Sequence, residues 1–419
     1  MSRLDELIQE KCSNGVEYVP LWSVTIWDKK FSSVDRKKQP KVKDYPYLLA
    51  SDLFALQVDN GNVFLLSTGE QTGWTTEELA GENLREGEVV TIPWGKSRAV
   101  TDCIKYYKGK FVTADNRIMT SNDAEKLNNK YLYYWIMSQG KTIDTFYRGS
   151  GIKHPDMAKV LDMEIPIPPL EIQREIVRIL DNFTELTAEL TAELTARKTQ
   201  YSFYRSRLLT FDANVEWKTV DEIAEVTDYV ANGSFAALKE NVNYKHTPDY
   251  AILVRTTDLV NGFDEENLVY IDKHAYNYLS KSKLYGGEII INNIGAGVGT
   301  TFLCPCLDTY MSLAPNSIMV KTNNNKFYYY WLNSKEGQNA IRKIVSQGSL
   351  PKFNKTGFRS IRLPVPPLDV QNRIVNVLDN FEKICSDLNI GLPAEIEARQ
   401  KQYEYYRDKL LTFKEVAAT

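Results

Sequence analysis

The sequence predicts an α+β fold in which two pseudo-symmetric globular domains are joined by two long, antiparallel helices resembling a coiled coil. Three observations support this fold class: an internal sequence repeat, short β-rich runs separated by turn residues, and long apolar stripes at helical spacing. A chain of 419 residues is also too long for one ordinary core, so two domains are expected.

The duplication is clearest in a proline-rich segment that leads into a helix. Residues 165–183 read IPIPPLEIQREIVRILDNF, and residues 363–381 read LPVPPLDVQNRIVNVLDNF. Farther on, residues 197–211 match residues 399–413 in the same way. Two equivalent halves present two equivalent surfaces, so the chain is expected to read a two-part target.

Both globular parts alternate β-rich runs with Gly, Asn and Asp turns, which predicts a mixed or antiparallel sheet. The proline-rich segments close each domain, because proline fixes φ and lacks the N–H that would continue a sheet or helix. The β-rich runs are residues 63–66, 89–92, 289–291 and 317–320. The expected divisions are a first domain at 1–164, a central helix at 165–211, a second domain at 212–362 and a C-terminal helix at 363–419.

The apolar stripe of the central helix begins near Ile172 and continues to Leu208 at spacings of three and four. This stripe predicts a helix of roughly 55 to 60 Å at about 1.5 Å per residue. Gly391 and Pro393 interrupt the equivalent stripe near the C-terminus, so a break is expected there. Two such stripes in one chain most simply bury each other as an antiparallel pair.

The central helix also contains a short internal repeat. Residues 187–190 and 191–194 both read TAEL, after a degenerate copy at 184–186. Four residues advance a helix by about 6 Å and rotate it by about 40°, so one unit can be gained or lost with the stripe nearly in register. This segment is interpreted either as an adjustable ruler between the domains or as ordinary helix-forming sequence without a spacing role.

Composition and termini indicate a cytoplasmic protein. The first twelve residues carry charges where a signal peptide needs an apolar run, and no apolar segment of membrane-spanning length occurs. The five cysteines are scattered, with Cys304 and Cys306 as the one close pair, which favours reduced thiols over a zinc site. A net charge of −3 argues against a sequence-blind nucleic-acid binder but permits a specific one with local basic loops.

No motif indicates catalysis. Residues 295–301 are glycine-rich but lead into Phe302 and not into a helix, so they are interpreted as a loop and not as a dinucleotide site. Residues 95–97 read GKS, yet Val90 stands where a phosphate-binding loop needs its first glycine. The chain is therefore predicted not to be an enzyme.

Several basic segments favour contact with phosphates. Residues 35–43 form a basic run that suits either DNA or a solvated loop, and residues 105–110 mix lysines with aromatic residues. In both halves a Gly-Ser loop precedes a lysine, which permits close backbone approach beside a cation. The candidate DNA-binding residues are Arg36, Lys37, Lys38, Lys41, Lys43, Lys96, Arg98, Lys108, Lys110, Arg148, Ser150, Lys153, His154, Ser349, Lys352 and Lys355.

The chain resembles the specificity (S) subunit of type I restriction-modification enzymes. The resemblance covers nearly the whole chain and rests on the two PPLxxQxxIVxxLDxF helices, the TAEL units and the QYEYYR segment at 402–407. It implies that two target-recognition domains each read one half of a split double-stranded DNA sequence and that the helices hold the halves apart. It also implies that residues 4–8 lie near the C-terminal helix, in a circular arrangement. The central repeat is shorter than its C-terminal counterpart, so the two helices are not expected to be fully equivalent.

The same resemblance implies a non-catalytic subunit that carries no cofactor. It is expected to dock two methyltransferase (modification) subunits and two motor-nuclease (restriction) subunits, and S-adenosylmethionine, ATP and Mg²⁺ would belong to those partners.

Two hypotheses from other classes remain at this point. The chain would be a duplicated helical scaffold without DNA contact if it showed no salt-sensitive, sequence-dependent DNA affinity. It would be an enzyme with an unrecognised site, such as a methyltransferase fused to its own reader, if the isolated chain bound a cofactor.

Overall fold

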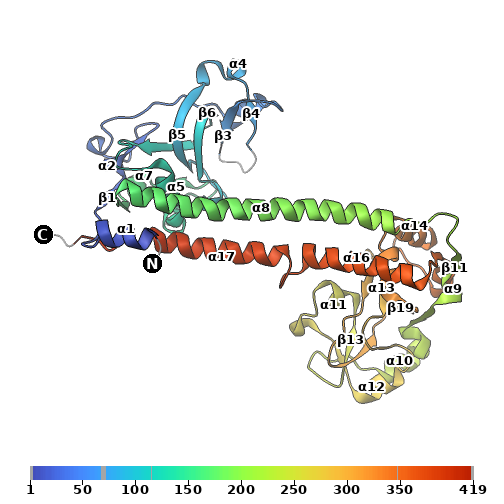
Figure 1. The fold of residues 1–419 in the computed structure, drawn as a ribbon. Coiled ribbons are helices and arrows are strands. Elements are labelled where there is room, and N and C mark those ends of the chain that lie inside the picture. The colour runs from blue at the N-terminus through green and yellow to red at the C-terminus, as the bar shows by residue number, and fades with distance from the viewer. Residues whose placement is uncertain (1–2, 68–71, 115, 347, 417–419) are drawn as a thin grey trace. The chain divides into compact units, whose positions relative to one another are not determined.

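A computed structural model describes residues 3–67, 72–114, 116–346 and 348–416 (Figure 1). The chain divides into two compact units, each with its own core. Unit 1 comprises Met1–Leu190 and Glu395–Thr419, and unit 2 comprises Thr191–Ala394. Within the described residues, no helix is long and apolar enough to cross a membrane.

Unit 1 is built on a six-stranded mixed sheet with the order β2-β7-β5-β6-β3-β4. All neighbouring strands are antiparallel except β3 and β6, which run parallel. Valine, leucine and isoleucine side chains of the central strands are buried, as the β-rich runs predict. The strands are β2 (Thr25–Trp27), β3 (Val63–Leu66), β4 (Trp74–Thr75), β5 (Arg85–Pro93), β6 (Lys105–Thr113) and β7 (Asn116–Ser121).

Unit 2 keeps this strand order but divides it between two sheets, β12-β19-β16-β17 and β14-β13-β18-β15, and adds the short strand β15 beside β18. The single long strand β6 of unit 1 corresponds to β17 and β18 together, because Pro305 lies between them and cannot donate to a sheet. The strands are β12 (Glu225–Asp228), β13 (Ala251–Val254), β14 (Tyr270–Ile271), β15 (Lys283–Leu284), β16 (Ile289–Asn292), β17 (Thr301–Leu303), β18 (Tyr310–Leu313) and β19 (Ser317–Lys321).

A two-stranded ribbon closes each unit where the proline-rich segment returns to the start of its own domain. In unit 1, β1 (Tyr18–Pro20) is antiparallel to β10 (Glu164–Pro166), with Tyr18 opposite Pro166. In unit 2, β11 (Trp217–Thr219) is antiparallel to β20 (Arg362–Pro364), with Trp217 opposite Pro364. The two ribbons have the same register, which shows that the duplication includes the domain ends.

The sequence Tyr-Tyr-Trp occurs at residues 133–135 on α5 (Asn129–Ser138) and again at residues 329–331 on α13 (Asn325–Leu332), and both tryptophans, Trp135 and Trp331, are buried. The helices of unit 1 are α1 (Arg3–Lys11), α2 (Leu21–Val24), α3 (Ala50–Ala55), α4 (Glu77–Ala80), α5 (Asn129–Ser138), α6 (Gly140–Thr145) and α7 (Met157–Leu161). Those of unit 2 are α9 (Val220–Ile223), α10 (Phe235–Asn241), α11 (Thr256–Val260), α12 (Lys273–Tyr278), α13 (Asn325–Leu332), α14 (Lys335–Ile344) and α15 (Lys355–Arg359).

The long helices confirm the predicted stripes. The central helix α8 (Leu170–Leu208) is continuous over 39 residues, whereas its counterpart is divided into α16 (Leu368–Ser386) and α17 (Leu392–Leu410) (Figure 1). Gly391 is required at the break, because a Cβ there would lie 2.6 Å from the Lys383 carbonyl oxygen. Pro393 lies in the first turn of α17, where its missing N–H costs nothing.

The long helices pair in each unit through stacked aromatic rings. In unit 1 the ring centroids of Phe183 on α8 and Tyr406 on α17 are 5.5 Å apart. In unit 2 the centroids of Tyr204 on α8 and Phe381 on α16 are 5.8 Å apart. The partner's number falls as the α8 number rises, so the pairing is antiparallel, as expected.

The repeated glutamine attaches each long helix to its domain. Gln173 Nε2 donates to the Pro168 carbonyl at 2.8 Å, and Gln371 Nε2 donates to the Pro366 carbonyl at 2.9 Å. Both glutamine side chains are buried. A buried amide with a partner fixes the angle between the proline-rich segment and the helix, which explains why both copies carry glutamine at this position.

The repeated aspartate makes a second attachment about two turns farther along each helix. In unit 1, Asp181 accepts from Tyr134 Oη at 2.5 Å and from Lys130 Nζ at 2.8 Å. In unit 2, Asp379 accepts from Tyr330 Oη at 2.7 Å and from Lys326 Nζ at 2.6 Å. The motif shared by the two halves is therefore a structural attachment between helix and domain.

The N-terminal segment of unit 1 lies beside the C-terminal end of the chain, as the resemblance implies. Leu4 and Leu7 on α1 belong to the same buried cluster as Leu411. In addition, Tyr18 Oη donates to the Phe413 carbonyl at 2.9 Å. The C-terminal segment thereby completes the core of unit 1.

Candidate nucleic-acid interface

In unit 1 an exposed loop is held by the turn that follows the central strand β5. The strands β8 (Tyr147–Arg148) and β9 (His154–Pro155) form a hairpin, and we call residues 149–153 between them the unit 1 lysine loop. Residues 94–97 form the unit 1 strand turn. The backbones of Lys96 and Lys153 exchange two hydrogen bonds, with N···O distances of 3.1 and 3.3 Å. The loop therefore has a defined position although it is on the surface.

Side chains of the strand turn also contact the hairpin. The rings of Trp94 and His154 lie 4.6 Å apart, and His154 Nδ1 is 3.0 Å from the Trp94 carbonyl oxygen. Gly95 permits this approach, because a Cβ there would lie 2.6 Å from Ile152 Cγ2. A larger residue at this position would require the exposed Ile152 side chain to move.

Unit 2 contains an equivalent arrangement. Residues 293–297 follow the central strand β16 as the unit 2 strand turn, and residues 348–352 form the unit 2 lysine loop. Ile294 and Lys352 form an isolated antiparallel bridge, and Gly295 N donates to the Pro351 carbonyl at 2.9 Å. Gly295 has a φ of +96°, a conformation that favours glycine.

Both lysine loops have the sequence Gly-Ser-x-x-Lys and expose the residues that the sequence singled out. Ser150 and Lys153 are exposed in unit 1, and Ser349 and Lys352 are exposed in unit 2. A hydroxyl, a mobile ammonium and nearby glycine backbone are groups that contact phosphates. The structure thus brings the predicted loop residues together with a strand turn in each unit.

Lys96 and Lys355 differ from the surface cations that the sequence predicts, because each ammonium already has a carboxylate partner. The Lys96 side chain is 9% exposed and forms an ion pair with Asp144. Lys355 Nζ lies 2.7 Å from Asp228 Oδ1, beneath the unit 2 lysine loop. These two lysines hold structure together and do not present free charge.

The basic run of residues 35–43 lies on the surface of unit 1, beginning with the short 3₁₀ helix η1 (Arg36–Lys38). Lys38 Nζ is 2.6 Å from Asp162, whereas the backbones of Arg36 and Lys37 complete the turn. Lys43 lies over the Tyr45 ring, with 5.9 Å between its Nζ and the ring centroid.

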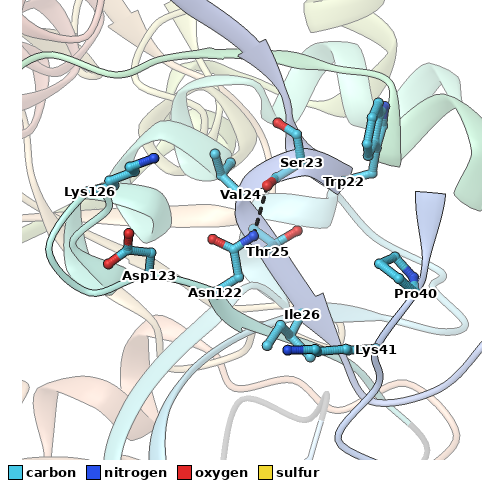
Figure 2. Close-up of a pocket in the computed structure, with 10 residues that line it drawn as sticks. All are labelled: Trp22, Ser23, Val24, Thr25, Ile26, Pro40, Lys41, Asn122, Asp123 and Lys126. Carbon is cyan, nitrogen blue, oxygen red and sulfur yellow. Dashed lines mark hydrogen bonds between the residues drawn. The ribbon is translucent and has the colours of Figure 1, made fainter. Parts of the chain in front are cut away.

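Lys41 lines a hollow of about 510 Å³ beside the edge strand β2 (Figure 2). Figure 2 shows Lys41 close to Ile26, with Asp123 and Lys126 on the other side of the hollow. Asn122 Nδ2 donates to the Ser23 carbonyl at 2.7 Å across its middle. Its lining alternates polar and apolar groups without a concentration of either charge.

The remaining predicted cations are spread over the sheet and hairpin of unit 1. Arg98 Nε is 3.4 Å from Cys103 Sγ. Surface ion pairs join Lys108 to Glu88 at 3.5 Å, Lys110 to Glu77 at 2.7 Å and Arg148 to Asp156 at 3.8 Å. Exposed pairs of this kind contribute little to stability, so their cations can exchange a carboxylate for a phosphate at small cost.

A buried charge lies beneath the unit 1 strand turn. Asp28 is 4% exposed, and burial raises the pKa of its carboxyl to about 6, although the Arg117 guanidinium opposes the shift. Arg117 lies over the Trp94 ring, with 3.8 Å between its Cζ and the ring centroid. Sequence reasoning missed this group, as it missed Gly95 and Gly295. The signal that would have found them is the common offset of about 200 residues between Asp28 and Asp228 and between the two glycines.

The cysteines and acidic residues form no candidate metal site. All five cysteines are free. Over the part of the chain that the structure describes, no three His, Cys, Asp or Glu side chains are grouped as metal ligands would be.

The family model for the type I restriction modification DNA specificity domain matches residues 28–197 and again residues 214–398. The chain belongs to this family. This specificity subunit is 31% identical to the EcoR124I/EcoR124II specificity subunit of Escherichia coli, over 96% of each chain. Its fold is similar to the crystal structure of the S subunit from M. genitalium, with 15% identity, 95% and 96% of the two chains covered and a TM-score of 0.53. It is also similar to a chain from a structure that describes complex assembly and conformational transition of the type I R-M system, with 13% identity, 95% and 97% coverage and a TM-score of 0.50.

Membership confirms the function that the resemblance implies. Specificity subunits are non-catalytic subunits that give type I systems their DNA target specificity, and this chain is such a subunit. The two other hypotheses, a scaffold without DNA readout and a fused enzyme, are not favoured. The specificity domain occurs twice in the chain, in agreement with the internal repeat.

Proposed function

We propose that each unit of this specificity subunit reads one half of a bipartite double-stranded DNA target through its lysine loop and strand turn. One observation carries the proposal: both units place an exposed Gly-Ser-x-x-Lys loop on the turn after the central strand. The frame is shared, but the residues of the turns differ, with WGKS in unit 1 and NIGAG in unit 2. A shared frame with different contact residues suits two modules that read different sequences.

Within each module the two segments have separate tasks. Lys153 and Lys352 contact phosphates and set the register of the unit on the duplex, while neighbouring turn residues approach base edges in the major groove. Arg36, Lys37, Lys41 and Lys43 add phosphate contacts beside unit 1. The two half-sites lie about one helical turn, or about 34 Å, apart.

The long helices set the separation of the half-sites, with residues 187–194 as the adjustable part. Residues 1–164 and 212–362 are the two target-recognition domains in this proposal, and residues 165–211 and 363–419 are the helical segments that separate them. Support comes from the continuity of α8 over 39 residues and from the matched glutamine and aspartate attachments that join α8 to unit 1 and α16 to unit 2. A continuous helix transmits any change of length to the domains that it joins.

Two pseudo-equivalent helix surfaces suit two copies of one partner. We assign two methyltransferase subunits to these surfaces, and two motor-nuclease subunits to the complete assembly. S-adenosylmethionine, ATP and Mg²⁺ belong to those partners, since the specificity subunit is non-catalytic. An assembly that modifies chromosomal DNA works where that DNA is, so we place it in the cytoplasm.

The proposal is tested by co-expressing the chain with its own methyltransferase subunit and mapping methylated adenines over the host genome by single-molecule sequencing. A bipartite motif with a fixed gap, absent when this chain is omitted, is the expected result. A contiguous motif, or an unchanged pattern of methylation from a purified stable complex, would contradict the two-module reading.

A further inference from the structure

An aspartate stands at the end of the first strand of the main sheet in both units: Asp28 directly follows β2, and Asp228 is the last residue of β12. In unit 2, Asp228 is paired with Ile318. In unit 1, Asp28 N donates to the Ile118 carbonyl at 2.9 Å, which places Asp28 at the same register. Trp27 and Thr227, one residue earlier, pair with the equivalent methionines of β7 and β19. The two aspartates are therefore structurally equivalent, and neither belongs to the repeated helix motif.

In unit 1 the aspartate acts on Arg117. Asp28 is fixed by the Ile118 N–H, which donates to Asp28 Oδ1 at 3.2 Å. Arg117, the neighbour of Ile118 on β7, is 4% exposed, and its charge favours the ionised form of Asp28. A buried guanidinium is costly without a nearby negative charge, and the Ile118 bond holds the Asp28 carboxyl next to the strand position of Arg117.

Arg117 in turn positions the strand turn. Its Cζ lies 3.8 Å from the centroid of the Trp94 ring and 5.7 Å from the centroid of Phe31, so the guanidinium lies against two aromatic rings. Trp94 contacts His154 at the end of the unit 1 lysine loop. The Ile118 N–H therefore fixes Asp28 next to the strand position of Arg117, and ring contacts continue from Arg117 through Trp94 to the loop.

In unit 2 the equivalent aspartate pairs directly with a lysine that follows the lysine loop. Asp228 Oδ1 accepts from Lys355 Nζ at 2.7 Å and from Ala231 N at 2.9 Å. Lys355 begins α15 three positions after Lys352, and Asn354 caps that helix through Gly357 N. The Asp228 contact therefore fixes the end of the unit 2 lysine loop.

We infer that Asp28 and Asp228 are equivalent positioning residues, each of which sets the lysine loop of its own unit and thereby the recognition of one half-site. This inference rests on the proposed function of the loops and extends it to residues beneath them. The aspartates contact no DNA; they act through Arg117 in unit 1 and through Lys355 in unit 2. Each effect is confined to one unit, because the contacts that carry it lie within that unit.

The test uses Asp28→Asn and Asp228→Asn in the complex with the methyltransferase subunit. The substitution keeps the size of the side chain and removes its charge. Methylation rates are measured on duplexes that carry the wild-type target or a single substitution in either half-site. Asp28→Asn is expected to reduce discrimination about tenfold at one half-site, and Asp228→Asn at the other, which is the size of effect that a displaced base contact produces. The exposed residues Asp59 and Asp308 supply matched controls, Asp59→Asn and Asp308→Asn, which should change neither.

Hydrogen exchange of the same complex without DNA gives an independent readout. Asp28→Asn should speed exchange in residues 94–97 and 149–154 and leave residues 293–297 and 348–353 unchanged. Asp228→Asn should give the reverse pattern. A purely structural role, in which the substitution weakens the whole unit, would speed exchange throughout the sheet of that unit.

The outcomes separate this inference from the proposed function. Loss of discrimination at opposite half-sites, with local exchange changes, supports it; equal loss at both half-sites, or no loss, overturns it. If the wild-type complex shows no bipartite preference, the proposed function fails, and the exchange pattern alone decides whether the aspartates position the loops. If an aspartate variant does not fold, Arg117→Gln and Lys355→Gln remove the same contacts from the other side and must give the same unit-specific pattern.

Discussion

The attachment of α8 to unit 1 through Asp181 gives a prediction whose size follows from the contacts. Substitution Asp181→Ala removes the acceptor of the Tyr134 hydroxyl and the partner of Lys130. Tyr134 is 2% exposed, and burial together with the bond to Asp181 raises the pKa of the phenol, so it remains a donor at neutral pH. The variant therefore leaves a buried hydroxyl without its partner.

The magnitude is the sum of two contributions. A hydrogen bond to a charged group contributes about 1.5 to 3 kcal/mol, and the 2.5 Å bond from Tyr134 belongs in this class. The Lys130 ion pair adds about 0.5 kcal/mol, because its ammonium is a third exposed. A loss of about 3 kcal/mol in the free energy of unfolding corresponds to a fall of about 6 to 12 °C in the melting temperature of a unit of this size.

Differential scanning calorimetry measures this loss, since each unit has its own core. Asp181→Ala should lower the transition of unit 1, and the matched variant Asp379→Ala should lower that of unit 2. Tyr134→Phe completes a double-mutant cycle with Asp181→Ala. A fall of less than about 2 °C, or effects of the two substitutions that simply add, would refute the argument that this bond holds helix to domain.

Three further predictions use other parts of the molecule. Deletion of residues 191–194 should shorten the unread gap by one to two base pairs, because it removes about 6 Å of helix; adenine mapping that shows altered half-site letters would contradict the ruler. Lys153→Ala and Lys352→Ala should each weaken DNA binding and reduce the slope of log affinity against log salt by about one; an unchanged slope in titrations at several salt concentrations would exclude the phosphate contact. Because burial raises the pKa of Asp28 from 3.8 to about 6, its contribution to stability is fully present below pH 3.8 and is lost as pH rises through 6. The unfolding free energy of wild type relative to Asp28→Asn should therefore fall by about 2 kcal/mol between pH 4 and 7 in denaturant titrations, and a flat difference would contradict the raised pKa.

The sequence predicted the features that depend on local pattern. The stripe from Ile172 to Leu208 follows helical periodicity and gave α8 almost to the residue. The break near Gly391 was predictable because glycine and proline interrupt helices, although Pro393 begins the next helix and does not itself end one. The β-rich runs were likewise found in strands.

The site depended on contacts between distant residues, which local pattern does not contain. Lys96 appeared in the sequence as one more surface cation, and Asp144, which pairs with it, is 48 residues away. The distance from Lys355 to Asp228 is greater, at 127 residues. Gly95 and Gly295 looked like parts of imperfect phosphate-binding motifs, yet Gly95 lies against the Ile152 side chain and Gly295, with a positive φ, donates to the Pro351 carbonyl. The duplication, which pointed to the lysine loops, also aligns Asp28 with Asp228 and Gly95 with Gly295, and comparing the two halves position by position would have found these residues.

The self-contained ribbon and glutamine attachment of each unit have an evolutionary consequence. Because β1 pairs with β10 and β11 pairs with β20, the chain enters and leaves each domain at one place. Recombination within the two proline-rich segments would therefore exchange a whole domain together with the residues that attach it to its long helix. New combinations of half-sites would arise by recombination between genes of this family, without any compensating change in the helices that their partners recognise.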